Sequence, residues 1–290
     1  MYKQNKSKKD PKKKSRAYRN GWGTQTVLLI GSLIILIPVL WVVLNSFKTS
    51  SAILTDPYSL PIPPNLENYV NAWGEAGLGR GFLNSIVITA ISVISIVFFS
   101  SMPAYVLARK VFIGRKAVYY YFVSGLMFPT FVAMVPLFLL MSDLKLLDSH
   151  LGLILVYTAY SMPFTIFILF AFFKDLPKSL EEAALMDGAG PFKTFFLVML
   201  PLAKPGLASA VIFNIVGIWN EYVMALILIQ TPELKTLPVS IANLMMVMQY
   251  KTDWGALYAG LIMSILPVVI IYIFFQRKLG AETTQGAVKE

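Results

Sequence analysis

Six long apolar segments constrain the fold of this 290-residue chain more than any other feature of its sequence. A helix needs roughly 20 apolar residues to cross the hydrocarbon core of a bilayer. Five of the six segments contain no Asp, Glu, Lys or Arg, and a soluble protein of this length could not bury them all. The pattern predicts an all-α membrane protein with six transmembrane helices. We expect these helices at 27–44, 82–108, 117–141, 151–173, 205–230 and 255–276.

The composition agrees with this class and excludes most catalytic functions. Hydrophobic residues make up 57% of the chain and charged residues 14%, with one histidine and no cysteine. No Gly-rich phosphate loop with a GK[ST] ending occurs, and no cluster of side chains suggests a metal site. We therefore expect no catalytic residue, no cofactor and no bound metal. The chain should therefore not hydrolyse ATP in the manner of P-loop enzymes.

The distribution of positive charge predicts how the chain is oriented. Of the 25 Lys and Arg residues, 20 lie before the first span, after the second, after the fourth or after the sixth. Connections rich in Lys and Arg stay in the cytoplasm, so both termini and the segment after the fourth span should be cytoplasmic. The net charge of +10 follows from this topology and from attraction to anionic lipid. No recognition fold accompanies the basic tail, so we expect no nucleic-acid partner.

These observations define the expected domain organisation. One membrane domain should cover 24–276, preceded by a basic cytoplasmic tail at 1–23 and followed by a cytoplasmic tail at 277–290. The apolar run after the basic tail has about the length of a membrane span and no small-residue cleavage pattern, so the first span should be retained. Closely spaced prolines in 45–81 favour turns or extended structure in an outer loop. We expect a multi-pass membrane protein.

Between the fourth and fifth spans lies a polar, helix-forming stretch, SLEEAALMDGAGPFKTFFLVMLP. Ser179 can cap a helix whose Glu182 reaches back to the amide of the cap, and Gly188 suits a left-handed stop. Pro191 suits the first position of a second helix, which Pro201 then interrupts. The stretch predicts a helix–turn–helix outside the bilayer.

One face of the first predicted helix carries small residues, which would let another backbone approach closely. The alternative is an amphipathic connector that only lies on the membrane surface. The residues of this face are Leu180, Ala183, Ala184 and Gly188.

This stretch resembles the EAA loop of ABC importer permeases, although that family usually has Ile at the position of Val198. The resemblance implies that 178–204 is a coupling loop, the surface by which a transmembrane subunit binds its ATPase. It further implies that Glu182 anchors the docking helix through its cap and a cation on the ATPase. The matching residues are Glu182, Ala183, Ala184, Gly188, Val198, Leu200 and Pro201.

Further segments resemble the carbohydrate branch of the family, the maltose-transporter-like inner-membrane subunit. This implies half of a sugar pathway in a bacterial inner membrane, with three kinds of partner: a second homologous permease, an ATP-binding subunit dimer and an extracellular solute-binding protein. An ABC importer permease for a non-sugar solute and a non-transporting membrane scaffold are the alternatives. The segments are Phe82–Ser85, Pro103–Tyr105, Leu107–Arg109, Trp219–Glu221 and Gly286–Lys289.

Glu221 is an unusual residue for its place, because a carboxylate inside an apolar span is costly unless it meets water or a partner. With Trp219 and Asn220 beside it, this residue either lines the solute pathway or forms an interhelical hydrogen bond. Its position toward the outer end of the fifth span favours the second interpretation. Polar and aromatic residues together would suit a sugar, since hydroxyl groups need hydrogen bonds and ring faces stack on aromatic side chains. The lone His150 is expected in a loop or capping role.

Overall fold

The computed structural model of the protein describes residues 21–74, 76–247 and 253–286. Helices joined by short connections form all of its regular structure, and no strand occurs in these ranges. The predicted all-α fold is confirmed. Most of the predicted basic tail, 1–20, and the C-terminal 287–290 lie outside the described residues, so the structure gives no account of either.

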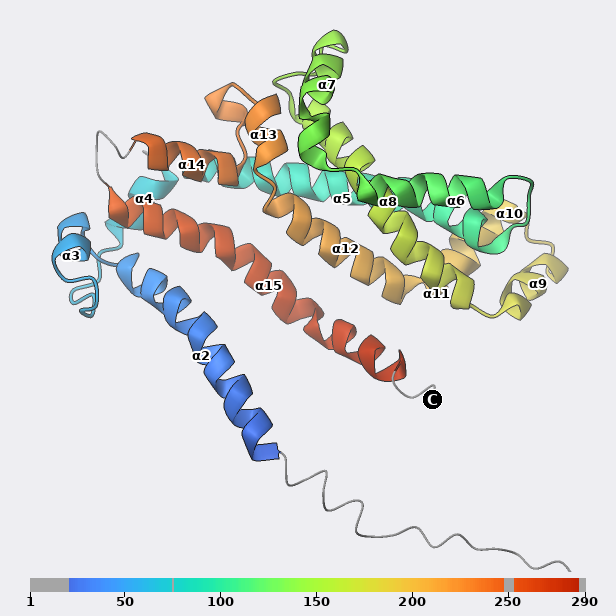
Figure 1. The fold of residues 1–290 in the computed structure, drawn as a ribbon, viewed down its shortest axis with the longest axis horizontal. Helices are drawn as coiled ribbons and strands as arrows, with labels where there is room; N and C mark the ends of the chain where they lie inside the picture. Colours follow the sequence, from blue (N-terminus) through green and yellow to red (C-terminus); the bar gives the residue numbers. More distant parts are fainter. Residues whose placement is uncertain (1–20, 75, 248–252, 287–290) are drawn as a thin grey trace, which may run out of the picture.

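Four helices in the described ranges are long and apolar enough to cross a membrane. In Figure 1, α2 diverges from the other three, and α5 and α8 lie side by side over much of their length. The last of the four continues to Gly286, past the expected boundary at 276. They are α2 (Gly21–Asn45), α5 (Leu78–Arg109), α8 (His150–Asp175) and α15 (Trp254–Gly286).

The third predicted span is not one continuous helix. Its two halves, Arg115–Met127 and Thr130–Asp143, are bent by 101°. Phe128 between them is extended (φ −81°, ψ 119°) because a residue before a proline avoids the helical region, and Pro129 follows it. The elements are α6 (Arg115–Ser124), η1 (Gly125–Met127) and α7 (Thr130–Asp143).

The fifth predicted span also differs from expectation. Its helix α12 (Lys204–Trp219) ends well before 230, and residues 220–222 separate it from α13 (Val223–Leu228). Before α12, the segment Pro191–Leu202 forms a second bent pair with it, at 74°. If each bent pair is one span, the described chain has six candidate spans, in agreement with the number predicted.

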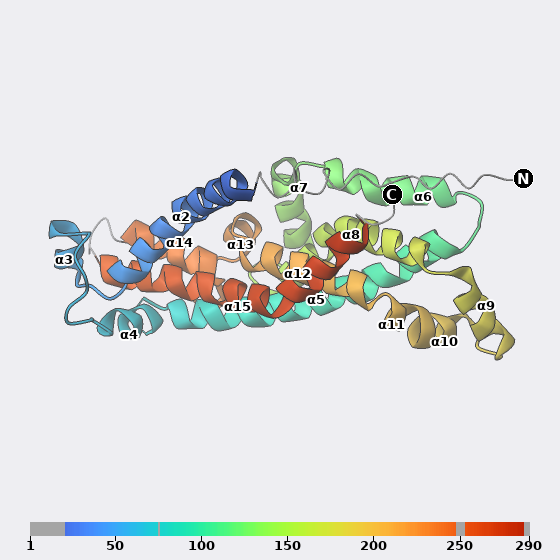
Figure 2. The same ribbon diagram turned by 90° about the horizontal axis from the view of Figure 1, so that it is seen from below.

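The short elements gather at the two ends of the long helices. Figures 1 and 2 both place α3, α4 and α14 at one end, and α9, α10 and the α5–α6 connection at the other. The expected outer loop thus contains two short helices. The elements of the first end are α3 (Ser50–Thr55), α4 (Glu67–Trp73), η3 (Pro232–Leu234) and α14 (Leu237–Val247); those of the second are α9 (Lys178–Met186), α10 (Pro191–Lys193), η2 (Thr194–Met199) and α11 (Leu200–Leu202).

Helix α5 contributes to all three buried clusters of the core. Its small polar residues, among them Ser92 and Ser100, are fully buried and allow neighbouring helices to approach closely. The cluster at the α9 end joins α5 and α8 to the coupling loop through Phe195 and Met199. Packing therefore fixes that loop to the transmembrane helices.

Candidate functional site

The predicted cap of the first coupling helix is wrong. Helix α9 begins at Lys178 with Pro177 as its N-cap, and no side chain caps it. Ser179 is thus inside the first turn, where it cannot cap the helix. Glu182 is exposed and does not reach back to the helix start. The first N–H groups of α9 therefore have no side-chain cap at this end.

The predicted end of that helix is confirmed. Gly188 has φ +78°, in the left-handed region, and its N–H donates to Leu185 O at 3.0 Å. A Cβ added at Gly188 would meet no atom within 4 Å. Pro191 opens α10 as expected, but Pro201 lies in the first turn of α11 and does not interrupt it. The interruption falls instead at Ala203, between α11 and α12.

The residues that match the EAA pattern divide into two groups. Ala184 is buried, and Val198 and Leu200 are half-buried against the cluster around Phe195. The other members of the pattern face away from the chain's own core; Glu182, Ala183, Gly188 and Pro201 are all exposed. The first group holds the loop on its own chain, and the second leaves a free surface at the end of the molecule.

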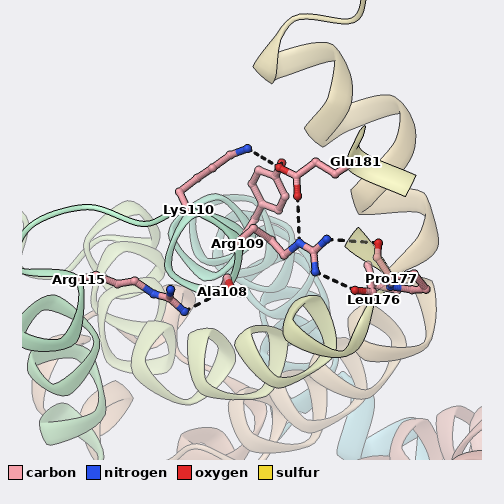
Figure 3. A network of polar contacts seen from close by, with 8 residues as sticks. Ala108, Arg109, Lys110, Arg115, Leu176, Pro177 and Glu181 are labelled. Carbon is pink, nitrogen blue, oxygen red and sulfur yellow. Dashed lines mark hydrogen bonds and ion pairs between the residues drawn. The ribbon is translucent and has the colours of Figure 1, made fainter. Parts of the chain in front are cut away.

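An ionic network attaches α9 to the end of α5 (Figure 3). Arg109 Nε donates to Glu181 Oε2 at 3.0 Å, and Lys110 Nζ pairs with Oε1 of the same carboxylate. The Tyr105 hydroxyl also donates to Oε1, at 2.8 Å. Arg109 continues to the connection before α9, since its Nη1 donates to Leu176 O at 2.7 Å.

The network keeps Glu181 ionised. Burial raises the pKa of its carboxyl group, but hydrogen bonds from Lys110, Tyr105 and Arg109 outweigh burial and hold the pKa below its usual range. Sequence reasoning missed this residue and singled out its neighbour Glu182. The three donors are more than 70 residues away along the chain, so no local pattern could have revealed them.

A cavity of about 480 Å³ opens between α8, α12 and the bend after η1. Its lining combines aromatic rings with polar groups. Among the lining residues are Tyr157, Tyr160, Ser161, Phe164, Asn214 and Glu221. Of these, only Glu221 is singled out by the sequence. The α8 residues were hidden in an apolar run whose inward face the sequence does not mark.

Glu221 makes an interhelical hydrogen bond and also lines the cavity. Its Oε2 accepts from the Tyr157 hydroxyl of α8 at 2.6 Å and from Ala225 N at 3.1 Å. Its Oε1 accepts from Met224 N at 2.8 Å. The carboxylate therefore caps α13 at the break between α12 and α13. Its hydrogen bond with Tyr157 joins this break to α8. Both interpretations of this residue have a geometric basis.

The two neighbours of Glu221 point elsewhere. Trp219 is buried, and its indole N–H donates to Ser264 O in α15 at 2.9 Å. Its ring meets that of Phe82 edge-on, with centroids 5.6 Å apart. Asn220 is exposed and donates to Val216 O within its own helix. Neither lines the cavity, so the expected triplet does not form one site.

His150 has a loop contact, as expected. It is the first residue of α8, and its Nε2 lies 2.9 Å from Leu234 O, whereas Ser149 caps the helix by accepting from Gly152 N. The described ranges contain no group of acidic, histidine or cysteine side chains that could hold a metal ion.

Known proteins resemble this chain over nearly its whole length. The family described as "Binding-protein-dependent transport system inner membrane component" matches residues 96–283. The diacetylchitobiose uptake system permease protein of Streptomyces coelicolor is 41% identical, over 92% of this chain and 88% of its own length. The trehalose transport system permease protein of Mycobacterium tuberculosis is 35% identical, over 92% and 97%. A crystal structure of a bacterial ABC transporter involved in the import of the acidic polysaccharide alginate matches with a TM-score of 0.77 and 25% identity, over 93% of this chain and 99% of its own.

Proposed function

Because this chain belongs to the family of binding-protein-dependent transport system inner membrane components, we propose that it is the sugar-conducting permease subunit of an ATP-driven importer. The observation that carries the sugar assignment is full-length similarity to permeases named for diacetylchitobiose and trehalose uptake. The aromatic and polar lining of the cavity agrees with it, because sugars present both hydroxyl groups and apolar ring faces.

The proposed topology has both termini and α9–α11 in the cytoplasm of a bacterial cell. The charge asymmetry of 20 to 5 supports this orientation. The structure adds that Arg109, the last residue of α5, and Lys110, the first residue of the basic connection after it, contact Glu181 of α9. Two segments that the charge pattern assigns to the same side thus meet. The proposed topology also treats 24–276 as one membrane domain.

The proposed coupling surface is the exposed group of EAA residues. Glu182, Ala183 and Gly188 lie free at the end of the molecule, where a cleft on an ATPase subunit could receive them. When ATP closes the ATPase dimer, α9 would move with its cleft. The motion would pass to α12 through the chain and to α5 through Glu181, opening the pathway alternately to the two sides.

Three further kinds of subunit complete the proposed importer. A second, homologous permease would supply the other half of the pathway, a pair of ATP-binding subunits would hydrolyse ATP, and an extracellular binding protein would deliver the sugar.

Reconstitution tests this function. The chain is purified with its neighbouring permease and ATPase subunits, inserted into liposomes and supplied with binding protein and radiolabelled diacetylchitobiose or trehalose. We expect accumulation that requires both ATP and binding protein. If only a non-sugar solute accumulates, the cargo of the importer is not a sugar. If the complex assembles and moves no solute, the chain is a scaffold.

A further inference from the structure

The proposed function leaves open whether this subunit touches the solute. We propose that the cavity between α8 and α12 is a binding subsite for an uncharged sugar, contacted directly by this chain. The proposal rests on the proposed function and adds to it the location of the site, its residues and the charge of its substrate.

The polar groups of the cavity suit hydroxyl groups. A carboxylate offers about four acceptor positions, and the protein's own donors to Glu221 use three, two at Oε2 and one at Oε1. One position at Oε1 therefore remains for a hydroxyl donor. The hydroxyl of Ser161, half-buried in the lining, makes no hydrogen bond within the described part of the chain.

The rings of the cavity suit the apolar face of a sugar. Phe164 and Phe213 meet edge-on, with centroids 5.7 Å apart at 88°. Phe213 and Tyr160 are each 53% exposed, so ring surface is available beside the polar groups. A sugar ring can stack on such a surface while its hydroxyl groups reach Ser161 and Glu221.

The polarity of the lining argues against lipid as the occupant. Hydrocarbon would leave the hydroxyl of Ser161 and the free acceptor position of Glu221 without partners, which is costly inside a membrane. Water or a polar solute satisfies both. The same lining would fit poorly against an apolar helix of a partner.

The charge of the lining selects among sugars. Glu221 is the one acidic residue that lines the cavity, and no Lys, Arg or His accompanies it in the described lining. An anionic sugar, such as a uronate or a sugar phosphate, would bring a second negative charge without a cation to offset it. The site should therefore accept uncharged sugars and reject anionic ones.

Gly217 makes the site testable without disturbing the core. It lines the cavity, and a Cβ added there would meet no atom within 4 Å. The natural chain has no cysteine, so Gly217→Cys provides one thiol in the subunit. The control is Tyr58→Cys, an 83% exposed position in the loop between α3 and α4.

The first experiment measures protection from a water-soluble methanethiosulfonate reagent in the detergent-solubilised complex without binding protein. Its probes are trehalose, diacetylchitobiose and a galacturonate disaccharide. At ten times its Kd a bound sugar leaves about one site in eleven free, so labelling of Gly217→Cys should slow about tenfold. Only the uncharged sugar that the complex transports should protect, and Tyr58→Cys should label at the same rate throughout. Equal protection by galacturonate would overturn the charge assignment.

The second experiment measures uptake. Gly217→Leu should fill the cavity and abolish sugar uptake while the complex assembles and hydrolyses ATP. If this variant fails to assemble, sugar uptake by Ser161→Ala is measured instead. The loss of one hydrogen bond should raise the KM for uptake about tenfold. A wild-type complex that imports sugar, with unchanged uptake in Ser161→Ala and no protection at Gly217→Cys, would overturn the subsite and leave the proposed function intact. Absence of uptake by the wild-type complex would instead contradict the proposed function.

Discussion

Arg109 at the end of α5 donates from Nε to Glu181 Oε2 in α9 at 3.0 Å, so a salt bridge joins a long apolar helix to the coupling loop. The exposed fractions of the two side chains are 4% and 12%, which means that water screens this pair weakly. Besides its covalent links to α8 and α12 and the packing of Phe195 and Met199, the loop therefore has an ionic connection to the membrane domain through α5.

The ionic connection predicts different effects for two neighbouring glutamates. Glu181→Gln leaves Arg109 without its charged partner, and breaking a buried pair costs about 3 kcal/mol or more. We expect a lower unfolding temperature in detergent and less sugar moved per ATP hydrolysed. Glu182→Gln, one residue later and exposed, should leave the unfolding temperature unchanged. Equal stability of the two variants would show that the Arg109 contact contributes little.

The lowered pKa of Glu181 predicts how its contribution varies with pH. A carboxyl group whose folded pKa is depressed stabilises the fold above its unfolded pKa, about 4.3 for Glu. That stabilisation is lost as the pH falls through the lower folded pKa. The difference in unfolding temperature between wild type and Glu181→Gln should be constant from pH 8 to about 5 and should shrink below about pH 4. A difference that persists unchanged in acid would contradict ionisation as its source.

Two left-handed glycines at the same end of the molecule provide a matched test of docking. Gly188 (φ +78°) and Gly114 (φ +86°) both have open space around an added Cβ. Tryptophan at either position carries a similar backbone cost, about 1 to 2 kcal/mol. Only Gly188→Trp should prevent co-purification of the ATPase and uncouple hydrolysis from uptake, because only this position belongs to the EAA surface. Normal ATPase binding and uptake by Gly188→Trp would argue against that surface.

Thiol labelling in intact cells tests the orientation. Met186→Cys in α9 is at a position 88% exposed, and Tyr58→Cys lies at the opposite end of the molecule, in the loop after α3. An impermeant reagent added outside should label Tyr58→Cys and spare Met186→Cys until the membrane is permeabilised. The reverse pattern would invert the topology.

Substitution of Glu221 separates its two roles. Glu221→Ala removes the cap of α13 and the hydrogen bond from Tyr157, each worth about 1 kcal/mol. We expect lower membrane abundance of this variant. Glu221→Gln keeps one oxygen, which can still accept from Tyr157 and Ala225, and loses the acceptor for Met224 N. Its abundance should therefore fall less than that of Glu221→Ala, while its uptake of sugar falls. Immunoblots of membranes and initial rates of uptake, measured together, test both statements.

The class of the fold, the number of spans and the end of the coupling helix could be predicted because they depend on local properties. Apolar length alone requires a membrane helix, and a left-handed stop at Gly188 follows from the absence of a Cβ. The break before Pro129 also has a local cause, although the apolar run hid it. The Ser179 cap failed because Pro177 began the helix earlier.

The candidate sites depended on contacts between distant parts of the chain. Glu181 and Glu182 are identical in type and adjacent, yet only the packing of α5 against the loop buries one and leaves the other exposed. Likewise, Glu221 meets Tyr157 across 64 residues, while Trp219 turns into the core. An apolar run tells how long a helix can be and that it belongs in a membrane. Which of its faces meets another helix, a cavity or lipid depends on how the helices pack, because the periodic signal that marks an inward face in water is weak where the surroundings are themselves apolar.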